Sequence, residues 1–248
     1  PVGGLVQTQA MSVNADGTAG YRLDARLNPL PAFARVVYWF DVTLADGTRF
    51  ASAQQEFVYS DNRFGWLGLD GQNARVHWYA GDAAFGVAAL DSAQRGIESA
   101  LALVPLESIA PVDIYIYANG GDLQSAIELG AQSWVAGHAS PEHSVAMILV
   151  PPSEKYIFDR HMPHEVTHLL MYQSLGPNYY NLPVWLREGM ASNAELYPNP
   201  DFDVALAAAV EANSLLPLAG LCASFPPDSN SAFLAYAESK SFVRFLID

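Results

Sequence analysis

The sequence contains a single cysteine, Cys222, and this scarcity limits the kinds of site that the chain can hold. One cysteine excludes an intrachain disulfide and any cluster of thiolate ligands, so a zinc site here would need nitrogen and oxygen ligands. Cys222 lies in an apolar stretch, where we expect a small buried hydrophobic residue. Cysteine scarcity is compatible with either side of a bacterial membrane and therefore identifies no compartment.

Positive charge is also scarce. The 12 lysines and arginines face 26 aspartates and glutamates, which gives a net charge of −14. Without a basic stripe, a nucleic-acid partner is excluded. No run approaches the roughly 18 apolar residues of a membrane-spanning helix. Because 51% of the residues are hydrophobic and only 15% are charged, the chain can form a substantial core and is not expected to be disordered.

The two ends of the chain suggest a partial sequence. It begins at Pro1 rather than methionine and ends inside a predicted helix, Ala232–Asp248. We therefore expect a processed or partial chain, truncated at its C-terminus, so the lack of a targeting segment carries little information.

The first seventy residues have a β pattern. Thr18–Leu27 alternates loosely, and Val36–Leu44 is aromatic and β-branched. We expect Thr48–Tyr59 to pair with Val36–Leu44 as a hairpin across a short Asp-Gly turn. A stretch rich in Gly, Asp and Asn follows at 60–73 and marks a boundary. The pattern predicts a small antiparallel, immunoglobulin-like β-sandwich as an accessory domain over residues 1–72.

The second domain, residues 73–248, alternates strands with helices and then becomes wholly helical. We expect strands over Arg75–Tyr79, Val112–Tyr117 and Ser144–Val150, and helices over Ala83–Val104 and from a cap at Asp122 to about Gln132. From Asp159 onward we expect only helix and loop. This order of elements is typical of an α+β domain.

The chemistry is concentrated in an H-E-x-x-H motif, His164 to His168. On a helix the two histidines are one turn apart and rotated by only about 40°, so both imidazoles can occupy corners of one zinc tetrahedron. Glu165 is rotated by about 100° from the first ligand and can act as base toward a bound water. Pro163 suits the first turn of this helix, which leaves His161 outside it.

A third ligand is expected downstream. Glu188 lies twenty residues after His168 in the segment Trp185–Ala191, which opens a further helix. Two histidines and one glutamate leave a fourth position open, as catalytic zinc sites do. The alternative is a helix with two structural histidines, and a solvated glutamate at position 188.

Two strings, H-E-x-x-H and W-L-x-E-G-x-A, resemble those of the gluzincin zinc metallopeptidases. The sequence is most similar to the peptidase MA-like bacterial proteins and more distantly to aminopeptidase N and thermolysin, over Val145–Asp248. The resemblance implies a thermolysin-like zincin catalytic domain with a mixed sheet, a Zn²⁺ cofactor, a peptide or protein substrate, and an extracellular or cell-surface location. The G-A-M-E-N motif of aminopeptidase N is absent, so no amino-terminal specificity is implied.

The resemblance also raises questions at individual positions. Many gluzincins carry an aspartate four residues after the ligand glutamate, where it orients the first histidine; this sequence has Ser192 followed by Asn193. Either of these residues, or another acid, is expected to replace it. Tyr236 corresponds to a downstream tyrosine that stabilises the oxyanion in related gluzincins, or else packs in a helical core. Strand Val145–Val150 is a candidate edge for substrate docking.

The sequence thus predicts a zinc peptidase in which Glu165 is the general base. One alternative is a zinc amidohydrolase acting on a non-protein amide. Another is a zinc-binding cell-surface protein with weak or no proteolysis. His138 and His143 flank a Ser-Pro turn and are interpreted as exposed loop histidines rather than as part of the cleft.

Overall fold

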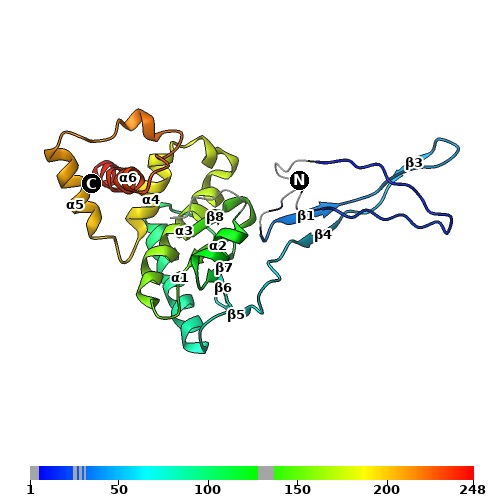
Figure 1. Ribbon diagram of the computed structural model, residues 1–248, viewed down its shortest axis with the longest axis horizontal. Helices are drawn as coiled ribbons and strands as arrows, with labels where there is room; N and C mark the ends of the chain where they lie inside the picture. Colours follow the sequence, from blue (N-terminus) through cyan, green and yellow to red (C-terminus); the bar gives the residue numbers. More distant parts are fainter. Residues whose placement is uncertain (1–5, 25–26, 28–29, 31, 128–136) are drawn as a thin grey trace. The chain divides into compact units, whose positions relative to one another are not determined.

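The computed structural model describes residues 6–24, 27, 30, 32–127 and 137–248, and the chain divides into two units, residues 1–30 and 31–248. The strands are β1 (Arg35–Tyr38), β2 (Asp41–Thr43), β3 (Arg49–Ala51), β4 (Gln55–Val58), β5 (Leu67–Asp70), β6 (Ala74–Trp78), β7 (Val112–Tyr117), β8 (Gly137–Ser140) and β9 (Val145–Leu149) (Figure 1). The helices are α1 (Ala83–Leu103), α2 (Gly120–Ala126), α3 (Phe158–Leu175), α4 (Val184–Ala194), α5 (Asp201–Glu211) and α6 (Ser229–Ile247). Short 3₁₀ turns are η1 (Pro141–His143), η2 (Lys155–Ile157), η3 (Gly176–Asn181) and η4 (Leu218–Leu221).

A five-stranded mixed sheet with the order β5-β6-β7-β9-β8 organises the larger unit. Strands β6, β7 and β9 run parallel, whereas β5 and β8 are antiparallel to their neighbours. Helix α1 makes the crossover that the parallel pair β6–β7 requires. A mixed sheet with helices agrees with the predicted α+β class. The expectation that Val145–Val150 forms a docking edge is wrong, because β9 lies between β7 and β8; the edge strand is β8.

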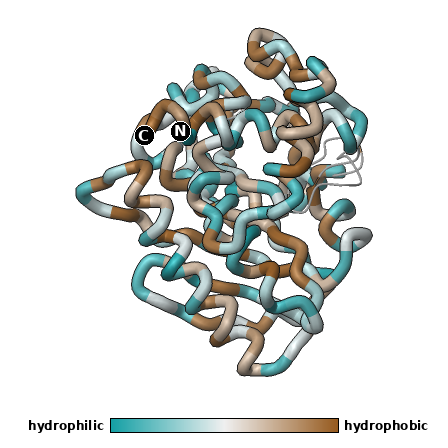
Figure 2. The backbone as a smooth tube through the Cα atoms, turned by 90° about the vertical axis from the view of Figure 1, so that its left-hand side faces the viewer, coloured by the Kyte–Doolittle hydropathy of each residue, from teal (hydrophilic) through white to brown (hydrophobic). Residues whose placement is uncertain are grey.

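The alternation of side chains along the central strands separates two cores. On one face Ile114, Ile116 and Ile148 are buried against α1 and α3, which also pack against each other. On the opposite face Tyr117 and Met147 are buried in a second cluster with α2. Figure 2 shows hydrophobic and hydrophilic stretches alternating over short distances along the chain. Among the described residues, no helix is long and apolar enough to cross a membrane.

The predicted N-terminal strands are only partly present. Val36–Leu44 and Thr48–Tyr59 do pair as a hairpin, but each is broken in two, giving the antiparallel pairs β1–β4 and β2–β3. Their residues are mostly exposed. The strand expected over Thr18–Leu27 is wrong for its described residues, which form no strand. Strand β5, inside the predicted 1–72 domain, joins the main sheet. A β-sandwich domain over 1–72 stays a prediction.

Most elements of the second half agree with their predicted ranges, and α1 begins behind a cap at Asp82, whose side chain accepts from the Phe85 amide. Asp122 is not a helix cap as predicted, because Asn119 caps α2 and accepts from the Asp122 amide. The predicted end of that helix near Gln132 lies outside the described residues. Cys222 is exposed rather than buried, because its side chain lies on the surface just after η4.

Candidate active site

Helix α3 begins at Phe158, earlier than predicted, so Pro163 lies inside the helix and His161 belongs to it. Both expectations about these two residues are therefore wrong. The physical reason is that the 3₁₀ turn η2 leads directly into α3, which places the proline ring one turn and a half from the start. A proline has no N–H for the carbonyl four residues earlier. The carbonyl of Asp159 is consequently left without its helical partner.

The free Asp159 carbonyl is used by the segment that follows α4. It accepts hydrogen bonds from the backbone amides of Leu196, at 2.8 Å, and Tyr197, at 2.9 Å. This contact fixes the end of α4 against the beginning of α3. Because Pro163 leaves the Asp159 carbonyl free to accept these amides, it allows a hydrogen-bonded contact between the two helices that carry the candidate ligands.

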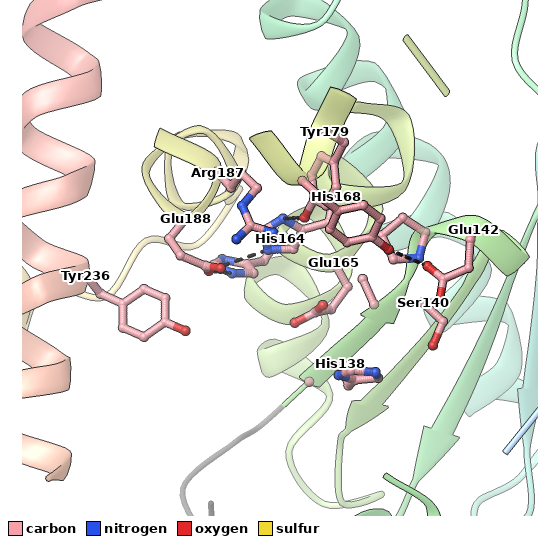
Figure 3. Close-up of a pocket in the computed structure, with 14 residues that line it drawn as sticks. His138, Ser140, Glu142, His164, Glu165, His168, Tyr179, Arg187, Glu188 and Tyr236 are labelled. Carbon is pink, nitrogen blue, oxygen red and sulfur yellow. Dashed lines mark hydrogen bonds and ion pairs between the residues drawn. The ribbon is translucent and has the colours of Figure 1, made fainter. Parts of the chain in front are cut away.

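The three predicted ligands are brought together by α3 and α4. Nε2 of His164 lies 3.3 Å from Glu188 Oε2, and Nε2 of His168 lies 3.5 Å from the same oxygen. All three ligand atoms lie within 4.8 Å of one another. Figure 3 shows the two imidazoles and the Glu188 carboxylate turned toward one point. His164 and His168 are one helical turn apart, as the H-E-x-x-H spacing predicts.

The outer nitrogen of each imidazole is held by a second side chain. Nδ1 of His164 lies 3.0 Å from Glu195 Oε1, and Nδ1 of His168 lies 3.0 Å from the Tyr179 hydroxyl. A carboxylate only accepts, so His164 Nδ1 carries hydrogen. With the same tautomer at His168, both neutral imidazoles could offer an Nε2 lone pair to a cation bound beside Glu188.

Glu195 takes the orienting role that was expected from Ser192, Asn193 or another acid. The Ser192 hydroxyl is buried without a hydrogen-bond partner among the described residues. The Asn193 amide instead donates to the carbonyls of Gly189 and Lys240. Neither residue therefore replaces the usual aspartate. A signal for Glu195 was present in the sequence, because it follows Glu188 by seven residues, about two helical turns, and directly follows the last residue of α4.

The donor set suits a zinc ion. Ligands held about 2.0–2.1 Å from tetrahedral zinc are about 3.3 Å apart, close to the 3.3 and 3.5 Å that separate Glu188 Oε2 from the two ring nitrogens. Two lone pairs and a carboxylate oxygen facing one another repel unless a proton or a metal cation lies between them. Nitrogen and oxygen donors with no sulfur also match the ligand types that zinc accepts.

The pKa shifts of the metal-free site also favour a bound cation. Burial disfavours a charged imidazole, yet hydrogen bonds to Glu188 and Glu195 raise the pKa of His164 well above its usual value. Burial alone would raise the pKa of Glu188, but the imidazoles of His168 and His164 hold it far below its ordinary range. The arrangement therefore stabilises positive charge between these side chains.

The candidate ligands open onto a cavity of about 350 Å³. Its lining residues come from β8, η1, α3, η3, α4 and α6: Gly137, His138, Ala139, Ser140, Pro141, Glu142, His164, Glu165, His168, Tyr179, Tyr180, Arg187, Glu188 and Tyr236. Figure 3 shows Glu165 beneath the imidazoles and the Tyr236 hydroxyl directed toward the same space. All five residues predicted for the site therefore line one cavity. His138, which was not expected to line the cleft, does so.

Burial raises the pKa values of the two candidate catalytic groups, Glu165 and Tyr236. Burial raises the pKa of Glu165 above its usual range, partly opposed by the charge of the neighbouring imidazoles. Burial, together with the negative charge of Glu188, raises the pKa of Tyr236 well above its usual value, so the phenol keeps its proton. Gly137 lets β8 approach closely, because a Cβ there would lie 2.3 Å from Glu165 Oε1.

Three further lining residues were not identified from the sequence. Tyr179 holds His168, and the Arg187 guanidinium lies 5.0 Å from the centre of the Tyr179 ring. Tyr180 donates a 2.5 Å hydrogen bond to Glu142 Oε2. The adjacent tyrosines of η3 carried no motif, and only the position of Arg187 immediately before Glu188 marked it as a neighbour of the site.

Comparison with known families agrees with this geometry. The model of the Peptidase MA superfamily matches residues 92–248, which is more than half of the chain and includes the whole candidate metal centre. The match begins within α1, well before the motif-based resemblance at Val145. Comparison with curated proteins finds no match. This family indicates a function of the metallopeptidase type and a general dependence on metal. The chain belongs to the Peptidase MA superfamily.

Proposed function

We propose that the chain is a zinc-dependent peptidase in which His164, His168 and Glu188 hold Zn²⁺. The observation that carries the proposal is the convergence of three ligand atoms whose outer partners, Glu195 and Tyr179, already fix the imidazoles. Zinc bound there would polarise the scissile carbonyl and acidify an attacking water. Glutamate and histidine ligands with a position left open are typical of catalytic rather than structural zinc.

Glu165 is the proposed general base. Its carboxylate is buried, lines the cavity and follows the first ligand on α3. Because burial raises its pKa, the carboxylate is a stronger base than an exposed glutamate. Glu165 takes a proton from the attacking water and then delivers it to the nitrogen of the leaving amine, so the peptide bond is exchanged for an amine and an acid.

Tyr236 is the proposed donor to the oxygen that gains negative charge. It reaches the cavity from α6, and its ring centre lies 6.1 Å from that of His164. Its raised pKa keeps the hydroxyl protonated, which is the form that can donate. The role assigned by the family resemblance is thus supported by position and by protonation state.

An extended peptide is the proposed substrate, and β8 is the strand on which it docks. β8 lies at the end of the sheet order, so one of its edges faces no strand among the described residues. All four of its residues, Gly137 to Ser140, line the cavity. Main-chain pairing along such an edge holds a peptide without selecting its side chains. An extracellular or cell-surface location belongs to the proposal on the family resemblance alone, and cell fractionation tests it.

Zinc content and peptide cleavage test the proposal together. After metal removal and reloading, the protein should hold one zinc per chain and cleave members of a peptide library, and a chelator should stop cleavage. Glu165→Gln should keep zinc and lose cleavage by about 10²-fold or more. Stoichiometric zinc with no cleavage of any peptide would favour a binding protein. Cleavage restricted to small non-peptide amides would favour an amidohydrolase.

A further inference from the structure

Arg187 is a cation inside the cleft without a carboxylate partner among the described residues. Most other arginine side chains are neutralised. Ion pairs join Arg35 to Glu56, Arg63 to Asp61, Arg75 to Asp113, Arg95 to Asp159 and Arg244 to Asp248. In a chain with a net charge of −14, an arginine that lines a cavity without such a pair is unusual.

The side chain is held rather than free. Its guanidinium carbon lies 5.0 Å from the centre of the Tyr179 ring, and Tyr179 is itself fixed by its contact with His168. Such cation–π contacts hold the guanidinium plane in place. Nε of Arg187 is buried and has no hydrogen-bond acceptor among the described residues. The guanidinium therefore has an unpaired donor, the residue lines the cavity, and Figure 3 shows it beside Glu188 and the imidazoles.

Apart from the imidazoles, the other charged groups of the cleft are acidic. Glu188 faces the imidazoles. Glu142 accepts from Tyr180, and its hydrogen bonds to His143 and Tyr180 lower its pKa to about 2, so it is charged. Glu165 faces the same cavity. Apart from the zinc position, the described lining of the cleft offers an anionic ligand one lysine or arginine side chain, that of Arg187.

We propose that Arg187 binds a carboxylate of the substrate, which makes this site selective for peptides that present one close to the scissile bond. The inference rests on the proposed peptidase function and names its substrate class. A guanidinium matches the geometry of a carboxylate, and the charge-assisted bonds between them are among the strong ones in proteins. The carboxylate can be the C-terminal group of the peptide or the side chain of an aspartate or glutamate.

Three N-acetylated peptides of one length distinguish these two sources. The first has neutral side chains and a free C-terminal carboxylate, the second is its C-terminal amide, and the third is that amide with glutamate in place of glutamine. For the zinc-loaded parent we expect kcat/KM to be about 10- to 150-fold higher for the first or the third than for the second. A preference for the first peptide identifies the C-terminal carboxylate as the group bound, and a preference for the third identifies the acidic side chain.

Arg187→Gln should reduce that preference to below about 3-fold. Arg187→Lys should give an intermediate value, because lysine keeps the charge and loses the planar fork. Using a ratio of two substrates removes any general effect that reaches His168 through Tyr179. Arg244→Gln is the matched control, since Arg244 of α6 forms an exposed pair with Asp248 at the end of that helix, and it should keep the parent's preference. A parent without a preference, or an Arg187→Gln protein that keeps it, would overturn the inference.

Binding provides a readout that does not depend on cleavage. Calorimetric titration of the zinc-loaded Glu165→Gln protein with the same three peptides should give a Kd about 10- to 150-fold lower for the preferred peptide than for the neutral amide. This difference in Kd should disappear when Arg187→Gln is added. If the parent cleaves no peptide, the proposed function fails while this titration still decides the role of Arg187. Equal Kd values for the three peptides would contradict carboxylate binding even in an active peptidase.

Discussion

Replacing Glu195 removes the hydrogen bond that orients His164 toward the metal position. Its Oε1 lies 3.0 Å from His164 Nδ1, and the Glu195 side chain is only 4% exposed, so water screens this contact weakly. Oε2 of Glu195 is buried without a partner among the described residues. The carboxylate is therefore stabilised chiefly by positive charge on or behind the imidazole, which couples it to the bound cation.

The magnitude follows from the strength of the contact. A hydrogen bond to a charged group contributes about 1.5–3 kcal/mol and a neutral one about 0.5–1.5 kcal/mol. Glu195→Gln keeps an acceptor and loses the charge, which costs about 1 kcal/mol and should weaken zinc binding about 5-fold. Glu195→Ala leaves Nδ1–H unpaired and should weaken zinc binding about 10- to 100-fold.

Competition with a chromophoric zinc chelator measures both affinities. Glu211→Gln, an exposed substitution at the end of α5, is the control and should bind zinc as the parent does. The order of affinity should be parent, then the glutamine variant, then the alanine variant. A Glu195→Ala protein that binds zinc within 2-fold of the parent would refute the reasoning, because His164 would then need no outer partner.

Three further predictions concern other parts of the site. Pro163→Ala restores an amide that competes for the Asp159 carbonyl, so zinc affinity should fall several-fold. The thermal stability of the metal-free protein should be kept or rise, because proline inside a helix costs about 3 kcal/mol. Unchanged zinc affinity would contradict the role of this contact in positioning α4. Tyr236→Phe should lower kcat about 10²- to 10³-fold at unchanged zinc content, and an equal kcat would remove Tyr236 from the mechanism. Burial lowers the pKa of His161 to about 4, below the 6.5 of an unperturbed histidine. The unfolded chain therefore binds the extra proton, and the stability that the neutral ring contributes is present above pH 6.5 and lost as the pH falls toward 4. Urea unfolding of the metal-free protein at pH 7 and 4.5 should show a loss about 2 kcal/mol greater in the parent than in His161→Gln, and equal losses would contradict a buried neutral ring.

Local patterns predicted much of the fold where one residue type dominated. The apolar spacing of α1 and the aliphatic runs of β7 and β9 gave ranges within about a residue of the observed ones. Strand β8, Gly-His-Ala-Ser, has no β-branched or aromatic residue and was missed, since its pairing with β9 rather than its own propensity makes it a strand. The first strand, predicted over Thr18–Leu27, alternates without a partner to pair with among the described residues.

The candidate ligands were predictable because the motif is local, whereas their supports were not. His164 and His168 share one helix, and the spacing alone fixes their common direction. Glu195 reaches His164 only because the end of α4 is attached to the Asp159 carbonyl, a contact between elements far apart in the sequence. Pro163 was placed at a helix start by its usual preference, although its position inside α3 is what makes that attachment possible.

X-ray absorption at the zinc edge of the reloaded protein tests the central claim most directly. We predict one zinc per chain with two imidazole ligands, the remaining ligands oxygen at about 2.0–2.2 Å, and no sulfur. Combined replacement of His164 and His168 by alanine should abolish this spectrum. A sulfur ligand, a site without imidazole, or stoichiometric zinc in the double variant would contradict a metal centre built from His164, His168 and Glu188.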